Sequence, residues 1–184
     1  LKRIFEANKK YQGVMSFTGA EALFLIEQGF DDILLGYPII DKNQIRNICK
    51  LTKTGKKIIL MTDCISHASL INSIAEEEQV TQPICIDVDM SSDFLGLHFG
   101  VYRSSLISVR DAKTYITQLL NFKNVKLTAL MGYEAQIAGV GDTNPANGIK
   151  NFAIKFLKKK SIPEYTQRRK EVIEYIKQNV IGKI

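Results

Sequence analysis

Residues 57–89 read KIILMTDCISHASLINSIAEEEQVTQPICIDVD, and this stretch decides the fold. It opens with an apolar run from Lys57 to Thr62 and closes with another from Ile84 to Asp89. Between them, Ser66 stands where a helix N-cap is expected. Apolar positions then recur every three or four residues, as on the buried face of a helix. That face comprises His67, Leu70, Ile71, Ile74 and Ala75. Two apolar strands joined by a helix predict a β–α–β unit with parallel strands.

The same alternation continues on both sides of this stretch. Further strands are expected at residues 13–17, 32–36 and 126–131. Helices are expected at residues 1–10, 19–29, 41–55, from Ser108 onward, 146–159 and 164–181. Strict alternation favours the α/β class and a partial (β/α)8 TIM-type barrel of about five parallel strands, because a full barrel has eight such units. A doubly wound sheet is the alternative, but Gly139-Val140-Gly141 is not its glycine-rich turn.

Composition narrows the class of protein. No apolar run approaches the roughly 18 residues of a membrane span, so we expect no membrane partner. The N-terminus has no secretory pattern and no initiator Met, which indicates a piece of a longer chain.

The three cysteines, Cys49, Cys64 and Cys85, form neither an even set nor a Cys-x-x-Cys pair. A disulfide framework and a zinc site are therefore not expected, and a reducing, cytoplasmic compartment is.

Positive charge is concentrated at the end of the chain. Residues 150–184 hold ten Lys and Arg against three Asp and Glu. A basic segment can indicate nucleic-acid binding. However, its aromatic residues fall at core-like helical spacings rather than as stacking platforms; they are Phe152, Phe156, Tyr165 and Tyr175. We therefore interpret the segment as a solvated helix face and expect no nucleic-acid partner.

The barrel rule selects candidate site residues, because the active site of such a barrel lies at the carboxyl ends of the strands. The candidates there are Phe17-Thr18, Gly36-Tyr37-Pro38, Thr62-Asp63, Asp87, Asp89, His98 and Gly132-Tyr133-Glu134 with Gln136. Asp87 and Asp89 share one face of a strand and could form a carboxylate pair with Glu134, as in a glycosidase. Equally, the two aspartates could serve neighbouring backbone or basic groups. His67 is expected in the core or at its boundary, and His98 in a loop.

Three stretches of the sequence resemble fold-type III pyridoxal-phosphate enzymes, the group of the alanine racemase N-terminal domain, D-serine dehydratase and D-threonine aldolase. The resemblance is strongest to the amino acid deaminase/aldolase branch. The stretches are 13–22 (GVMSFTGAEA) continuing through 28–38 (QGFDDILLGYP), 85–89 (CIDVD) with 98–104 (HFGVYRS), and 131–142 (MGYEAQIAGVGD). They occur in the family's order and cover most of the chain.

The resemblance implies pyridoxal 5'-phosphate as cofactor. The family usually has an arginine on the cofactor's phenolic oxygen where this sequence has His98, a group that titrates near neutrality. Tyr133 matches a tyrosine beside the cofactor and is the candidate catalytic residue. Arg103 is a further candidate for the cofactor or a substrate carboxylate, with a surface ion pair as the alternative. Asp87 and Asp89 would support these contacts. No metal ligands are expected.

The resemblance also implies parts that this chain does not contain. The family's Schiff-base lysine would precede Leu1, the phosphate loops would follow Ile184, and a C-terminal β domain completes the enzyme. Residues 1–184 are thus expected to be an incomplete alanine-racemase-like barrel domain, inactive alone. The parent would be a homodimeric deaminase, dehydratase, aldolase or racemase of small D- or β-hydroxy amino acids. The alternatives are a non-catalytic pyridoxal-phosphate-binding protein of the homeostasis type and a carboxylate-based hydrolase barrel.

Overall fold

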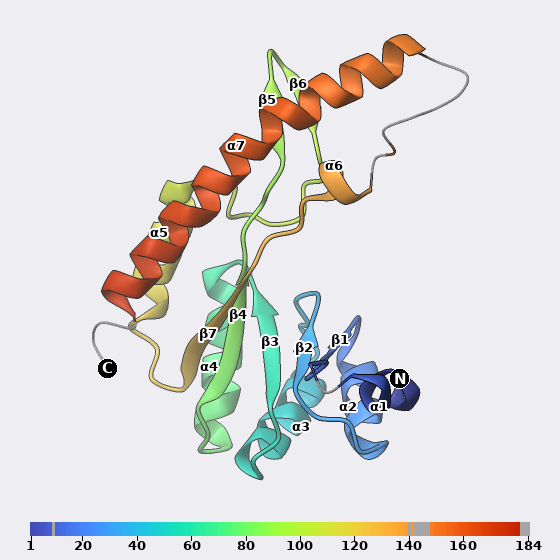
Figure 1. Cartoon of the computed structure of the whole chain (residues 1–184). Helices are drawn as coiled ribbons and strands as arrows, with labels where there is room; N and C mark the ends of the chain where they lie inside the picture. The colour runs from blue at the N-terminus through green and yellow to red at the C-terminus, as the bar shows by residue number, and fades with distance from the viewer. Residues whose placement is uncertain (9, 140, 142–147, 181–184) are drawn as a thin grey trace. The chain divides into compact units, whose positions relative to one another are not determined.

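A computed structural model describes residues 1–8, 10–139, 141 and 148–180 of the protein (Figure 1). The chain divides into two compact units. Unit 1 comprises Leu1–Ile86 and Asn121–Ala129, and unit 2 comprises Asp87–Leu120 and Leu130–Ile184. Several predicted positions lie outside the described residues, namely Val140 and Asp142 of the third motif and the helix ends at 146, 147 and 181.

A parallel sheet of five strands forms the centre of unit 1, and β4 and β7 continue from it into unit 2. Its order is β1-β2-β3-β4-β7, so β1 and β7 are its edges. The strands are β1 (Val14–Ser16), β2 (Ile33–Leu35), β3 (Ile58–Thr62), β4 (Gln82–Asp87) and β7 (Val125–Met131). Each lies within two residues of its expected position. The predicted class, an α/β partial barrel with five parallel strands alternating with helices, is confirmed.

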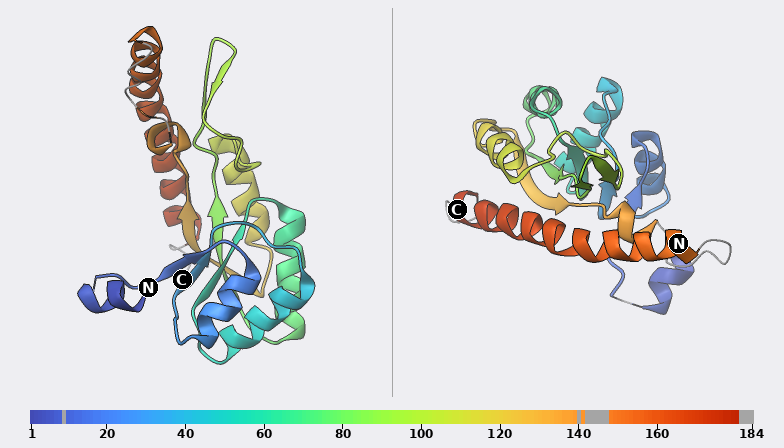
Figure 2. Two further views of the ribbon diagram at one scale, coloured as in Figure 1. Left: turned by 90° about the vertical axis from the view of Figure 1, so that its right-hand side faces the viewer. Right: turned by 90° about the horizontal axis from the view of Figure 1, so that it is seen from above.

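Helices α2 (Gly19–Glu27), α3 (Lys42–Lys53) and α4 (Ile65–Glu77) lie side by side along one face of this sheet (Figure 2). A short α1 (Lys2–Ala7) precedes β1. Helix α3 begins as predicted, because the Asp41 carboxylate accepts hydrogen bonds from the amides of Asn43 and Gln44. Its buried residues are Ile45, Ile48 and Cys49, which lie on one face of the helix. The apolar runs of β3 and β4 are buried almost throughout.

The predicted start of α4 is wrong. The helix begins at Ile65 with Cys64 as N-cap, so Ser66 lies in the first turn. Strand β3 ends at Thr62, and only two residues separate it from the helix. The Ser66 hydroxyl lies 3.4 Å from the Cys64 sulfur. A connection this short leaves no turn for Ser66 to cap.

Unit 2 contains an antiparallel hairpin where the sequence indicated an irregular loop. Strands β5 (Ser92–Phe94) and β6 (Leu97–Phe99) pair across a two-residue turn. The turn residues Leu95 and Gly96 have φ values of 50° and 85°. Two consecutive left-handed residues are the geometry of a tight hairpin turn. His98, expected in a loop, therefore lies on β6.

Helix α5 (Val109–Leu119) confirms its predicted cap at Ser108, which accepts from the Asp111 amide while the Asp111 carboxylate accepts from the Ser108 amide. A four-residue α6 (Ala135–Ala138) follows β7. The two final helices expected from the sequence are one helix, α7 (Gly148–Asn179), with Pro163 inside it. An interior proline costs a helix about 3 kcal/mol. Helix α7 has fully buried residues on both sides of that proline, Ser161 and Val172, and these anchor it within unit 2.

No helix among the described residues is both long enough and apolar enough to cross a bilayer.

Candidate functional site

Asp87 and Asp89, which the sequence placed on one face of a strand, meet at Arg103 instead. Asp87 is the last residue of β4, and Asp89 lies beyond its end. The Asp87 carboxylate contacts the Arg103 Nε at 2.8 Å. The Asp89 carboxylate accepts from the Arg103 backbone amide at 2.9 Å. Both carboxylates are buried, and the Arg103 side chain is only 9% exposed, so this ion pair is not a surface pair.

The other carboxylate oxygen of Asp89 binds the turn that follows this residue. It accepts from the Ser91 amide at 2.8 Å and contacts the Ser91 hydroxyl. Glu134, the third member of the suggested carboxylate set, forms an ion pair with Arg169 of α7. These three acids therefore hold backbone amides and cations. Their arrangement favours a supporting role over that of a paired acid and base.

Tyr133 lies next to the Arg103 guanidinium. The centre of the guanidinium is 5.5 Å from the centroid of the tyrosine ring. Such a cation–π contact orients both groups, and the Asp87 carboxylate fixes the guanidinium in turn. Tyr133 itself is 42% exposed. The buried Asp87 carboxylate thus holds the Arg103 guanidinium, which in turn contacts the accessible ring of Tyr133.

His98 is held on the hairpin by two contacts. Its Nδ1 lies 2.9 Å from a carboxylate oxygen of Asp93, its cross-strand partner. Its ring stacks on Tyr102 with centroids 3.7 Å apart and an angle of 13° between planes. The Nε2 atom is buried and has no hydrogen-bond partner among the described residues. Because a carboxylate at one nitrogen sets the tautomer and orientation of an imidazole, Asp93 defines how the His98 ring is held.

His98 and Tyr133 line the same depression, whose volume is about 400 Å³. Its other walls are Phe99, Gly100, Val101, Ala135, Gln136 and Gly139. Gly100 has a φ of 133°, and a Cβ there would lie 2.7 Å from the Cβ of Ser91. Only glycine allows the chain to leave the hairpin this close to Ser91. Apolar walls with a few polar groups are typical of small-molecule sites.

Sequence reasoning missed two residues of α7 that contact this site. The Arg168 guanidinium donates to the carbonyls of Asp89 and Ser91 at 2.6 and 3.1 Å. The Ser161 hydroxyl lies 2.9 Å from both the Ser92 hydroxyl and the Gln136 amide nitrogen. Their sequence signal is their spacing with the buried Val172, since polar residues eleven and four positions before it share its helix face.

The strand-end candidates of unit 1 form a separate group. Phe17 and Tyr37 make an edge-on ring contact with centroids 4.9 Å apart, and both are exposed. Thr62 is buried. His67 lies in the core, as expected, with Nε2 2.6 Å from the Ile39 carbonyl. Its burial lowers the pKa of the imidazole, while the contact with that carbonyl acts in the opposite direction.

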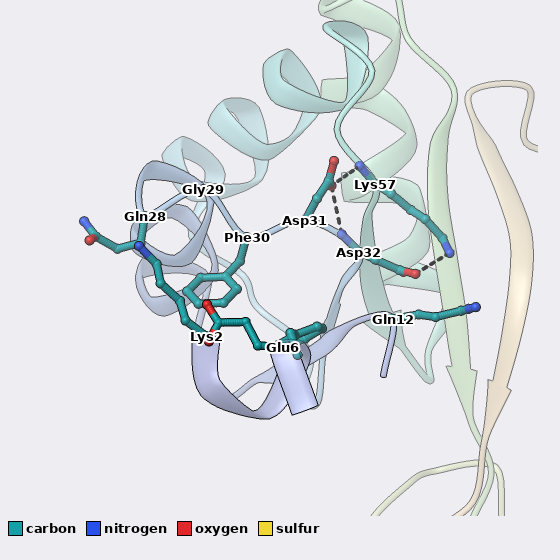
Figure 3. A pocket seen from close by; sticks show the side chains of 10 residues that line it. Lys2, Glu6, Gln12, Gln28, Gly29, Phe30, Asp31, Asp32 and Lys57 are labelled. Atoms are coloured by element: carbon teal, nitrogen blue, oxygen red, sulfur yellow. Dashed lines mark hydrogen bonds and ion pairs between the residues drawn. The ribbon is translucent and has the colours of Figure 1, made fainter. Parts of the chain in front are cut away.

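A larger hollow of about 500 Å³ lies at the opposite, amino ends of β2 and β3 (Figure 3). The Asp31 carboxylate there accepts from the amides of Asp32 and Lys57, and Asp32 pairs with the Lys57 ammonium at 2.7 Å. These charges tie the starts of two strands together. Asp31 and Asp32 are thus engaged in structural contacts, and the barrel rule places chemistry at the other strand ends.

The described residues contain no group of three or more His, Cys, Asp or Glu side chains that could hold a metal ion. Cys49, Cys64 and Cys85 are free thiols. Burial raises the pKa of the Cys49 thiol to about 11, so this thiol stays protonated at neutral pH.

Several solved structures share this fold. The D-threo-3-hydroxyaspartate dehydratase from Delftia sp. HT23 superposes with a TM-score of 0.59 over 90% of this chain, at 13% identity. Alanine racemase from Clostridium difficile 630 superposes with a TM-score of 0.59 over 97% of this chain, at 16% identity. The same racemase in complex with cycloserine gives 0.55 over 96%, also at 16% identity. The chain has the fold of the alanine racemase-like barrel.

This likeness confirms the expected barrel at the level of the fold. The chain spans 38% of the length of the dehydratase and 40% of that of the racemase. No protein-family model and no curated protein sequence matches it. Function must therefore be argued from the site.

Proposed function

We propose that this chain is part of a pyridoxal-phosphate-dependent enzyme that acts on small D- or β-hydroxy amino acids by deamination, dehydration, aldol cleavage or racemisation. One observation carries the proposal. His98 and Tyr133, two of the residues that the sequence resemblance assigns to the cofactor, line one depression of unit 2 on an alanine racemase-like fold.

The residues present fit that cofactor. A depression of about 400 Å³ is within the size range of sites for small molecules. The His98 Nε2 has hydrogen-bonding capacity that the described residues do not use. The accessible phenol of Tyr133 can donate to or accept from a ring substituent or a phosphate. When bound, the cofactor supplies an electron sink for bond cleavage at the substrate α-carbon.

In this proposal each residue has a definite task. Asp93 orients the His98 imidazole, whose Nε2 would hold the cofactor by a hydrogen bond. Arg103, held by Asp87, fixes the Tyr133 ring, and the Tyr133 hydroxyl holds or moves a proton beside the substrate. Asp89 and Arg168 keep the turn after β4 in place. The amine that would bind the cofactor covalently is assigned to no residue of this chain.

The test is turnover by the protein purified with its natural flanking sequence. D-serine, D-threonine, D-threo-3-hydroxyaspartate and D-alanine are offered with pyridoxal phosphate. Release of ammonia with a 2-oxo acid, release of an aldehyde, or loss of optical activity identifies the reaction. Tyr133→Phe is expected to lower kcat by about 100-fold, within the usual range for loss of an acid–base group. Tyr11→Phe, an exposed tyrosine in unit 1, is the matched control and should change nothing.

Other outcomes would contradict the proposal. Tight cofactor binding without turnover of any amino acid would favour the non-catalytic binding protein. Hydrolysis of glycosides with no cofactor binding would favour the carboxylate-based hydrolase, for which Glu134→Gln should then abolish activity.

A further inference from the structure

We propose that Ser161 of α7 is a positioning residue that holds the two walls of the His98–Tyr133 depression at their working separation. This inference rests on the proposed function for its consequence in cofactor binding, but its structural part stands alone. Ser161 is completely buried and contacts one side chain from each wall.

The first wall is the β5–β6 hairpin, which lies against α7 in Figure 1 and shares contacts with it through β5. The Ser161 hydroxyl lies 2.9 Å from that of Ser92, the first residue of β5. Ser92 pairs with Phe99 and the next residue, Asp93, pairs with His98. Asp93 also holds the His98 Nδ1. Fixing Ser92 therefore fixes the strand that aims the imidazole.

The second wall is the segment that follows β7. The Gln136 amide nitrogen donates to the Ser161 hydroxyl at 2.9 Å and to the Met90 carbonyl at 2.6 Å. Because the Met90 carbonyl can only accept, the nitrogen of this amide must face it, and the orientation of Gln136 is defined. Gln136 is 1% exposed and lies three residues after Tyr133. Its position therefore constrains the backbone that carries the phenol.

The hydroxyl of Ser161 satisfies both contacts at once. It accepts from the Gln136 amide and has its own proton left for the Ser92 oxygen. Alanine at this position would remove both bonds and leave two buried polar groups without that partner. The hairpin and the segment after β7 would then lose the only side chain among the described residues that bonds to both Ser92 and Gln136.

Proton NMR of the histidine rings tests this inference without cofactor, because the chain has only two histidines. In Ser161→Ala, the His98 ring signals should shift and broaden, while those of His67, in the core of unit 1, should stay in place. Ser161→Thr retains the hydroxyl and should restore the wild-type signal. Ser73→Ala, at an exposed helix position of α4, is the control. His98 signals that are identical in Ser161→Ala and wild type would overturn the inference.

A double-mutant cycle sharpens the same test. Ser92→Ala removes the hairpin half of the contact, so the double variant should move the His98 signal no further than Ser161→Ala does. Independent, additive shifts would contradict a shared bond. If Ser161→Ala fails to fold, Ser92→Ala alone must still shift His98 and leave His67 in place, and an unchanged His98 signal there would overturn the inference.

Cofactor affinity separates this inference from the proposed function. In the protein with its natural flanks, Ser161→Ala should weaken pyridoxal-phosphate binding roughly tenfold, which is within what the loss of its two buried hydrogen bonds allows. Unchanged affinity in the variant would overturn the role of Ser161. Failure of the wild type to bind, with His98 still displaced in the variant, would instead refute the proposed function and leave the structural role intact.

Discussion

Unit 1 and unit 2 are built on different kinds of interior. Unit 1 holds most of the buried hydrophobic residues, including Ile33, Ile58, Leu60 and Ile84, which are fully buried. Unit 2 holds most of the buried polar residues; they are Asp87, Asp89, Ser91, Ser92, Ser104, Gln136 and Ser161. Both carboxylates that are buried lie in unit 2. The interior of unit 1 is thus a regular apolar sheet, whereas in unit 2 hydrogen bonds and ion pairs fix the positions of the buried groups.

This difference has a physical meaning. Apolar burial is non-directional and tolerates small displacements, whereas buried polar groups require defined partners at defined distances. Natural chains place such demanding networks where a functional geometry must be fixed. The polar interior of unit 2 is therefore consistent with a site, and the apolar interior of unit 1 with a scaffold. Three changes test the contrast.

The largest effect is expected from Arg103→Ala in unit 2. This change leaves the buried Asp87 carboxylate without its cation, which should cost about 3–5 kcal/mol in the free energy of unfolding. Urea denaturation measures it. Lys57→Ala removes a partner of the exposed Asp32 pair and should cost no more than about 1 kcal/mol. Equal losses of unfolding free energy for the two changes would show that the buried ion pair of unit 2 stabilises the protein no more than the exposed pair does.

A somewhat smaller effect is expected from Ile71→Ala in unit 1. Ile71 is fully buried in α4, and truncation should cost about 3 kcal/mol through lost burial and the cavity left behind. Ile40 is 79% exposed, so Ile40→Ala should stay within about 0.5 kcal/mol. The same denaturation experiment compares them. A cost below 1 kcal/mol at Ile71 would contradict an apolar scaffold.

The smallest effect concerns pH and His67, a buried titratable group of unit 1. Its burial lowers the pKa below the ordinary value of about 6.5, so the folded protein keeps the imidazole neutral where the unfolded chain takes up a proton. The stabilisation is fully present above about pH 6.5 and is lost as pH falls toward the folded pKa. His67→Gln should flatten this dependence of the unfolding free energy. If the unfolding free energy of the variant depends on pH as that of the wild type does, this role of His67 is refuted.

The sequence predicted best those elements whose structure depends on residues close together in the chain. The starts of α3 at Asp41 and of α5 at Ser108 were predicted, because each depends on a cap hydrogen bond to an amide two or three residues away. The five strands were predicted because buried parallel strands are continuous apolar runs. Asp87, His98, Arg103 and Tyr133 were selected from strand ends and the family resemblance.

What the sequence missed depends on contacts between distant residues. The hairpin turn at Leu95-Gly96 uses a left-handed leucine, which no propensity favours. Helix α7 continues through Pro163, although a proline predicts a break. Ser161 and Arg168 join the site through partners more than 60 positions apart in the chain, Ser92 and Asp89. Such partners have no local signal.

The absorption spectrum with pyridoxal phosphate tests the central claim most directly. The protein with its natural flanks is titrated with the cofactor, reduced with borohydride, and compared with His98→Gln. The account predicts a visible band that borohydride abolishes and a shifted, weaker band in the variant, because His98 would contact the ring oxygen. Absence of any band in the wild type, or a His98→Gln spectrum identical to it in position and affinity, would contradict the account.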